Sequence, residues 1–164
     1  MRFIIVISVL FISSCISFRG VTIPTGVNTF YVEMPVVNEL NAPPELAQIF
    51  METLRQKVRE QSRLVWNENE PDVVFTPIIK RYTVTSVAPQ EGDLVAFNRL
   101  DVSISIDYEN TISEEEDDGS YSKSFQAFQD FNASENLQDL EEGLIALIFD
   151  DITERIFNDT FSDW

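Results

Sequence analysis

Strict alternation of apolar and polar side chains along residues 100–109 limits the folds open to this chain more than any other feature. The apolar positions are Leu100, Val102, Ile104, Ile106 and Tyr108, and the polar ones are Asp101, Ser103, Ser105, Asp107 and Glu109. Because successive side chains of a β-strand point to opposite faces, this run predicts a strand that is buried on one face and solvated on the other. The fold must therefore supply an apolar layer to cover it.

Three other segments have the composition of strands. They are residues 28–34, with Phe30, Val32 and Met34 on one side, residues 73–87, and residues 121–131, with Tyr121, Phe125 and Ala127 on one side. The alternation within 73–87 slips between Ile79 and Tyr82, and Pro77 lies in the same segment. We therefore expect a β-bulge or an irregular edge there.

Two segments show helical periodicity. In the first, Asn41 to Glu45 has the composition of a helix start, and the apolar stripe that follows is Leu46, Ile49, Phe50, Leu54 and Val58. We expect this helix to end near Ser62. The second is expected to begin near Ser134 and Glu135, and its apolar stripe is Leu137, Leu140, Leu144, Leu147, Ile148, Ile152 and Ile156.

The resulting element order, β-α-β-β-β-α, predicts the fold class. Helices with one apolar stripe and strands with one apolar face fit an α+β two-layer sandwich, with two helices packed on one face of a four-stranded mixed sheet. The strand–helix–strand crossover makes strands one and two parallel, and the strands that follow are antiparallel.

The N-terminus predicts a bacterial lipoprotein signal. Arg2 precedes an apolar run from Phe3 to Ile12, and two serines lead to Cys15, the only cysteine. The run is shorter than the roughly 20 residues that span a bilayer, so we expect cleavage before Cys15 and acylation of its thiol. The alternative is an ordinary signal peptide with an incidental cysteine. We expect a signal peptide at 1–14, a lipidated tether at 15–27 and one domain at 28–164.

The net charge of −17 is unevenly distributed. Residues 1–106 have a balance of −2 and residues 107–164 a balance of −15, so nucleic acid is an unfavourable partner. A smaller anionic ligand could use the basic residues of the first half, or these charges could simply solvate the surface. They are Arg55, Lys57, Arg59, Arg63, Lys80, Arg81 and Arg99.

Residues for common catalytic chemistry are scarce. The chain has no histidine, and its only cysteine is the expected acylation site. We therefore expect no enzyme, no cofactor and no metal site. An enzymatic alternative would need paired carboxylates of raised pKa in a deep pocket. The acidic run 114–118 lacks the ligand spacing of a calcium loop and is expected to be a solvated hairpin tip. The residues alone indicate a lipid-anchored α+β protein that binds or assembles something.

Several stretches of the chain, in their order and spacing, resemble the lipopolysaccharide-assembly lipoprotein family LptE in its divergent, non-enterobacterial branch. They are CISFRG at 15–20 with IP at 23–24, QSRL at 61–64, YTVT at 82–85 with VAP at 87–89, NRL at 98–100, IFND at 156–159 and FSDW at 161–164. The resemblance implies two helices on a four-stranded sheet, as predicted above.

The resemblance also implies a function. Members of this family are outer-membrane lipoproteins that plug the large β-barrel LptD, help its assembly and assist insertion of lipopolysaccharide into the outer leaflet, without covalent chemistry. Basic residues on the sheet of family members contact lipid phosphates, and Lys80, Arg81 and Arg99 are the candidates here by location. Cys15 is followed by Ile-Ser-Phe-Arg rather than an acidic run, so we expect a periplasm-facing inner-leaflet anchor. The alternative is a free-standing periplasmic lipid- or protein-binding lipoprotein without a barrel partner.

Overall fold

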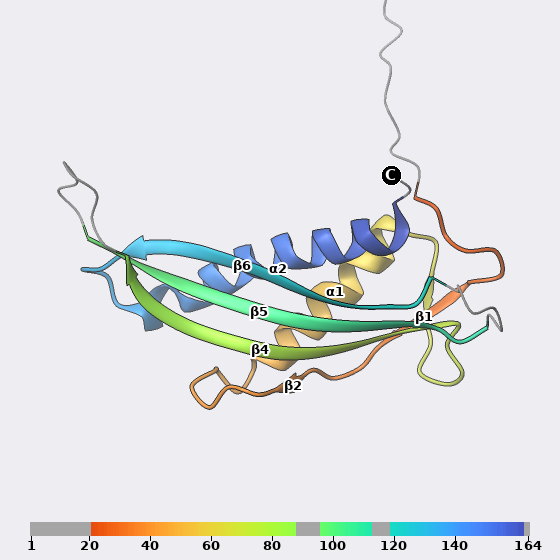
Figure 1. The fold of residues 1–164 in the computed structure, drawn as a ribbon, viewed down its shortest axis with the longest axis horizontal. Helices are drawn as coiled ribbons and strands as arrows, with labels where there is room; N and C mark the ends of the chain where they lie inside the picture. Colours follow the sequence, from red (N-terminus) through yellow and green to blue (C-terminus); the bar gives the residue numbers. More distant parts are fainter. Residues whose placement is uncertain (1–20, 88–95, 113–118, 163–164) are drawn as a thin grey trace, which may run out of the picture.

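The computed structural model describes residues 21–87, 96–112 and 119–162. Its elements, in chain order, are β1 (Thr29–Val32), β2 (Val36–Val37), α1 (Leu46–Gln61), β3 (Val65–Trp66), β4 (Val73–Val87), β5 (Phe97–Asn110), β6 (Tyr121–Asn132) and α2 (Leu137–Phe161). Figure 1 shows the long strands β4, β5 and β6 running side by side. The predicted signal peptide, Cys15 and the acidic run 114–118 lie outside the described residues.

The sheet is mixed, as expected, but it has six strands rather than four. Its order is β3-β1-β4-β5-β6, and β2 pairs with β4. β1 is parallel to β4, while β4–β5 and β5–β6 are antiparallel, which confirms the predicted crossover. β2 and β3 escaped prediction because two residues are too few to show any alternation.

The irregularity predicted in 73–87 is present in β4. The register with β5 shifts between Ile79 and Arg81, which confirms the slip expected from the sequence. Pro77 is tolerated because β1 pairs with β4 only as far as Phe75, and β2 begins pairing at Ile78. Proline has no backbone N–H to donate, so the gap between these two partners is a suitable position for it.

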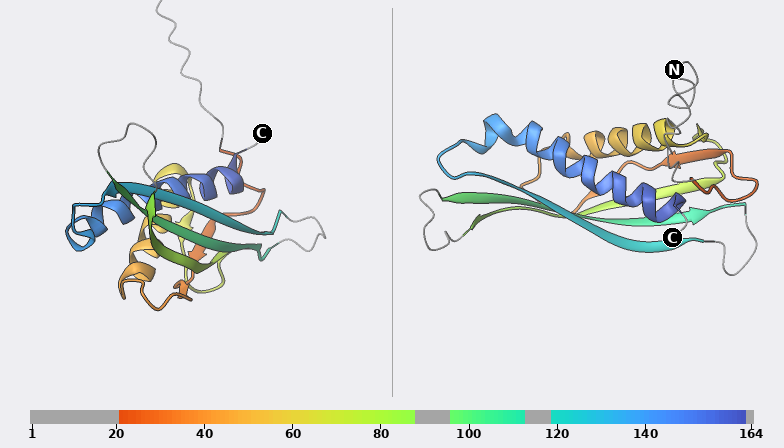
Figure 2. Two further views of the ribbon diagram at one scale, coloured as in Figure 1. Left: turned by 60° about the vertical axis from the view of Figure 1, so that its left-hand side comes forward. Right: turned by 90° about the horizontal axis from the view of Figure 1, so that it is seen from above.

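Both helices pack on the same face of the sheet (Figure 2). α1 begins at Leu46 and not at Asn41, and no side chain caps it. The two consecutive prolines explain the delay, because a residue that precedes proline is disfavoured in helical geometry. α2 begins at Leu137, where the side chain of Asn136 accepts a hydrogen bond from the N–H of Gln138.

The core lies between this helix pair and the sheet. The apolar positions predicted for β5 are all buried there, and so are Phe30 and Val32 of β1. Two apolar residues that we assigned to the inner side are instead exposed, Met34 by 54% and Leu147 by 57%. Met34 follows the end of β1, and Leu147 points away because the buried positions of α2 pass through its neighbour Ile148.

Residues 21–27, which we call the N-terminal clip, pack against one end of the domain. Val21 forms a β-bridge with Ser162, and the N–H of Thr22 donates to the carbonyl of Phe161 at 2.7 Å. Val27 is fully buried in the core. Gly26 permits the turn between them because its φ is +94°, a conformation that other residues rarely adopt.

Candidate functional site

The face of the sheet turned away from the helices, which we call the open face, consists of alternate residues of β4, β5 and β6. Three neighbouring rows across these strands are Thr83–Asp101–Phe128, Thr85–Arg99–Asp130 and Val87–Phe97–Asn132. Phe97 and Phe128 are 41% and 47% exposed. Exposed phenylalanines beside charged side chains give this end of the open face an amphipathic character.

Arg99 of β5 is held by two neighbours in β6. Its guanidinium donates from Nε and Nη2 to the two carboxylate oxygens of Asp130, at 2.7 and 2.9 Å. It also lies over the ring of Phe128, 3.7 Å from the ring centre. The hydrogen bond from Arg99 lowers the pKa of Asp130 below its ordinary value, which favours the ionised pair.

Arg81 of β4 has an acidic partner as well. Its guanidinium lies 3.5 Å from Asp101, whose second oxygen accepts a hydrogen bond from Gln126 at 2.8 Å. Arg81, Arg99, Asp101, Phe128 and Asp130 together form a group that we call the Arg99 cluster. Each of its two arginines is thus matched by an aspartate on a neighbouring strand.

Lys80, the third candidate, is placed differently. It lies at the register shift between Ile79 and Arg81, where no β5 residue is opposite to it. Its side chain is exposed and forms no ion pair with the described part of the chain. The structure therefore brings Arg81 and Arg99 onto one face, with Lys80 at the bulge beside them.

Two members of the basic segment on α1 have evident structural partners. Lys57 bridges to Asp150 and Glu154 of α2 at 2.8 and 3.0 Å. Burial disfavours its charged form, but the hydrogen bonds to these carboxylates outweigh burial and raise the pKa of Lys57. Arg55 pairs with Glu52 at 3.3 Å, and its guanidinium lies 4.4 Å from the ring centre of Trp66.

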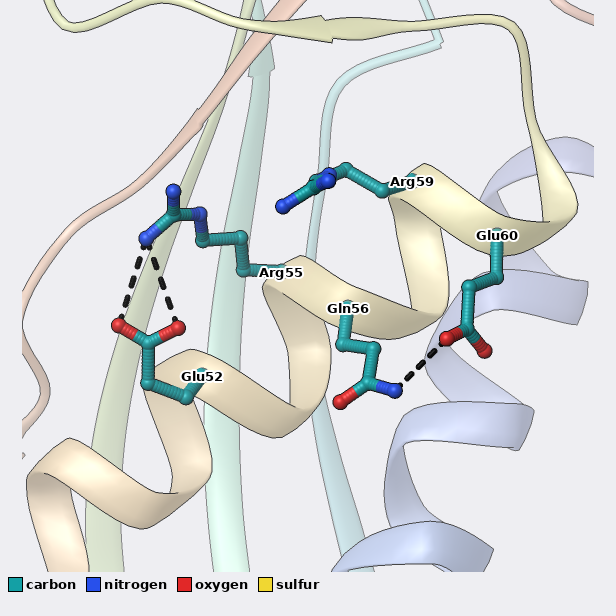
Figure 3. A pocket seen from close by; sticks show the side chains of 5 residues that line it. All are labelled: Glu52, Arg55, Gln56, Arg59 and Glu60. Carbon is teal, nitrogen blue, oxygen red and sulfur yellow. Dashed lines mark hydrogen bonds and ion pairs between the residues drawn. The ribbon is translucent and has the colours of Figure 1, made fainter.

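Figure 3 shows a shallow pocket on α1, with a volume of about 310 Å³. Its lining residues are Glu52, Arg55, Gln56, Arg59 and Glu60. All five belong to one helix, and four of them pair with each other, Arg55 with Glu52 and Gln56 with Glu60. A space between the side chains of a single helix does not converge on a substrate, so this pocket has no catalytic arrangement.

Two further shallow grooves lie where α1, α2 and β4 approach one another. Glu141 lines both grooves, and most of the other lining residues are acidic or aliphatic. Tyr82 donates a hydrogen bond from its hydroxyl to Glu141. Burial, followed by this hydrogen bond, raises the pKa of Tyr82. The contact joins β4 to α2, and a raised tyrosine pKa here reflects packing.

The described residues also offer no cluster of three or more acidic or cysteine side chains that could hold a metal ion. Neither of the two helices in this part of the chain is long and apolar enough to cross a bilayer. The open face is therefore the surface with the most distinctive chemistry.

The aspartate and phenylalanine partners of the candidate arginines were not among the predicted site residues. Phe128 and Asp130 have the opposite parity from the buried Phe125 and Ala127, so the alternation of β6 already placed them on the solvent side. The signal available in the sequence was Phe128, an aromatic residue at a solvent-side position of β6. Pairing Asp130 with Arg99 required the β5–β6 register, which no local pattern provides.

Comparison with known families decides what kind of domain this is. The model of the family LptE, described as lipopolysaccharide-assembly, matches residues 27–160. The chain belongs to the LptE family. The match extends from the end of the N-terminal clip almost to the end of α2. LptE proteins are non-enzymatic lipoproteins of lipopolysaccharide assembly, consistent with the scarcity of catalytic groups.

Solved structures share the fold of this LptE chain. A neuraminyllactose-binding hemagglutinin homolog from Helicobacter pylori aligns with a TM-score of 0.56 at 9% identity, covering 87% of each chain. A hypothetical protein from Chlamydia trachomatis aligns with a TM-score of 0.55 at 10% identity, covering 82% of this chain and 98% of that one. At such identities the likeness concerns the fold alone. No curated protein matches the chain in sequence.

Proposed function

We propose that this LptE-family chain is acylated at Cys15, is anchored in the periplasm-facing leaflet of the outer membrane, and plugs an LptD-like β-barrel. There it helps the barrel to assemble and assists the insertion of lipopolysaccharide into the outer leaflet. The observation that most supports this proposal is the family match over residues 27–160. The lipobox-like sequence ending at Cys15 is an independent argument for the anchor.

The charge of α2 indicates what the barrel lumen should be like. The sequence of α2 contains seven acidic residues and one arginine: Asp139, Glu141, Glu142, Asp150, Asp151, Glu154, Asp159 and Arg155. Lys57 pairs with Asp150 and Glu154, Arg155 with Asp151, and Lys123 with Asp159, which leaves a negative excess centred on the first half of α2. A plug with this surface fits a lumen wall that is rich in lysine and arginine at the height of α2.

The open face is the proposed contact for lipopolysaccharide. Its phosphates are anionic, and the Arg99 cluster combines two guanidinium groups with an exposed phenylalanine. Because Asp130 and Asp101 already bind these guanidinium groups, a phosphate must displace or share them. Contact of this kind is weak and reversible, which suits a lipid that is passed onward rather than stored.

Affinity purification from solubilised outer membranes tests the barrel partnership. A tagged, acylated chain should be recovered with one large β-barrel protein at a fixed stoichiometry, identified by mass spectrometry. Recovery of the acylated chain without any barrel would contradict the plug and favour a free-standing lipoprotein. An unmodified thiol at Cys15 or an uncleaved leader in the native protein would contradict the anchor.

Charge reversal tests the lipid contact separately. We expect Lys80→Glu, Arg81→Glu and Arg99→Glu each to weaken binding of purified lipopolysaccharide, with the largest loss at Arg99. Arg59→Glu is the matched control, because Arg59 is an exposed arginine on α1, on the other side of the sheet. If these three variants bind like this control, the open face is not the lipid contact.

A further inference from the structure

The N-terminal clip fixes the point at which the chain leaves the domain toward Cys15. Val21 forms a β-bridge with Ser162, and Thr22 hydrogen-bonds to Phe161 at the end of α2. Ile23 and Val27 pack in the core. An ideal Cβ on Gly26 would lie 3.2 Å from the side chain of Ile112, so the loop after β5 reaches the same end. The C-terminal end of α2, the clip and the end of β5 therefore form one end of the domain, which we call the clip end.

The distance from Cys15 to the clip end is limited by covalent geometry. Six residue steps separate Cys15 from Val21. A fully extended chain advances at most ~3.3–3.6 Å per residue, so these steps span no more than roughly 20 Å. An acylated Cys15 lies at the bilayer surface, and this limit would keep the clip end within the same distance of the lipid.

The Arg99 cluster lies near the opposite end. Arg99 is eleven residues before Asn110 in β5, which at about 3.4 Å per residue places it ~37 Å along the strand from the clip end. The other end of the domain also contains the start of α2 (Figure 1). The separation between the two ends thus exceeds the reach of the residues that join Cys15 to Val21.

The charge of α2 disfavours an orientation in which this helix lies on the membrane. The exposed surface of α2 has acidic residues along its length, including Asp139 and Asp151. That orientation would press these carboxylates against the lipid phosphates. At the clip end, Val21 and Ile112 are apolar and 39% and 45% exposed, so part of this end can approach the bilayer.

We propose that the N-terminal clip orients the domain, so that the clip end faces the phospholipid bilayer and the Arg99 cluster is held away from it. This inference rests on the acylation of Cys15 in the proposed function. It gives the short connection a role beyond attachment. Phospholipid phosphates of the anchoring leaflet are kept from the Arg99 cluster, which remains available to lipid that arrives from another direction.

Energy transfer from single labelled cysteines to labelled lipid headgroups tests the orientation. Once Cys15 is acylated, an introduced cysteine is the only free thiol. Thr25→Cys places a donor on the clip, and Glu135→Cys places one before α2 at the far end; both positions are exposed. In vesicles of phosphatidylcholine with a headgroup acceptor, we expect several-fold higher transfer from position 25 than from position 135. Equal transfer, or more from position 135, would overturn the proposal.

Two variants separate orientation from folding. Ten Gly/Ser residues inserted between Gly20 and Val21 leave the clip intact but lengthen the connection, so transfer from position 25 should fall. Thr22→Pro removes the N–H that donates to Phe161. In this variant, energy transfer from position 25 and from position 135 should become more similar. If neither variant changes the ratio of transfer between the two positions, the clip does not orient the domain.

Vesicle flotation distinguishes this proposal from the proposed function. Failure of the native, processed chain to float would contradict both the anchor and the orientation. Flotation with equal transfer from the two positions would overturn only the orientation. Co-purification of a barrel is a separate measurement, and it tests the barrel partnership whatever the orientation of the domain.

Discussion

The two faces of the sheet belong to the same strands but differ in the interactions that their side chains make. On the helix-covered face, Leu100, Ile104 and Ile106 are fully buried among apolar neighbours. On the open face, Arg99 and Asp101 lie on either side of Leu100 in sequence and pair with charged groups on adjacent strands. Packing specifies the first face, whereas register and electrostatics specify the second.

This difference shows where the molecule can vary without losing its fold. A side chain on the covered face contributes through the apolar area that it removes from water, about 25 cal/mol per Å². A charged pair on the open face contributes little, because water screens it and the two side chains lose conformational freedom. The open face is therefore free to be shaped by binding.

The largest expected effect comes from truncating matched phenylalanines on the two faces. Phe75 is fully buried and contacts Tyr108 and Phe161, with ring centres 5.1 and 6.3 Å apart. We expect Phe75→Ala to lower the free energy of unfolding by about 3–5 kcal/mol. Phe128→Ala on the open face should lower it by about 0.5 kcal/mol. Urea unfolding measures both, and similar losses would contradict the distinction between the faces.

A smaller effect is expected at the ion pair that joins the two helices. Lys57→Met removes the contacts with Asp150 and Glu154 and should cost about 1 kcal/mol near neutral pH. Lys57→Arg is the matched control that keeps the charge. A cost as large as that of Phe75→Ala would mean that charge, rather than apolar packing, dominates the covered side.

The pH dependence of the Lys57 effect follows from the two pKa shifts. The pKa of Glu154 is lowered by its hydrogen bond from Lys57, so its contribution is present above the ordinary 4.5 and is lost as pH falls through the lowered value. The pKa of Lys57 is raised, so its contribution is present below 10.5 and is lost as pH rises through the raised value. The difference between wild type and Lys57→Met should be level from about pH 5 to 10 and shrink on either side.

The smallest effect on stability is expected at the open face itself. Asp130→Asn removes the carboxylate that holds Arg99 and should leave the unfolding midpoint unchanged within error. Binding of lipopolysaccharide should instead become several-fold tighter, since Arg99 no longer has a competing anion. Mild acid should not reproduce this gain in the wild type, because the pKa of Asp130 lies below its ordinary 3.8. Weaker binding by Asp130→Asn would show that the pair itself, and not free Arg99, is recognised.

Much of the fold was predictable because it depends on local periodicity. The alternation around Ile104 identified β5 and its buried face, and the slip after Ile79 identified the bulge in β4. The boundaries of α1 were less accurate, because the effect of Pro43 and Pro44 on the preceding residues delayed the helix to Leu46. Leu147 was misassigned because adjacent leucine and isoleucine residues fit two different stripes on one helix.

The candidate site was predictable only in part. The sequence singled out Lys80, Arg81 and Arg99 by location, and the strand pairing places Arg81 and Arg99 on the open face. Each of these two arginines has an aspartate partner because β4, β5 and β6 pair side by side, although two hairpin connections separate these strands in sequence. Partners such as Asp130, 31 residues away from Arg99, have no local signature.

The amino-acid sequence by itself determined the type of each long element and which side of it is buried, because these depend on side-chain spacing within a few turns or residues. Tertiary structure decided the two short strands, the charge partners on the open face and the attachment of residues 21–27 to the end of α2. These features rest on backbone register and on hydrogen bonds between segments far apart in the chain. Such contacts acquire their geometry only when the helices and the sheet have packed together.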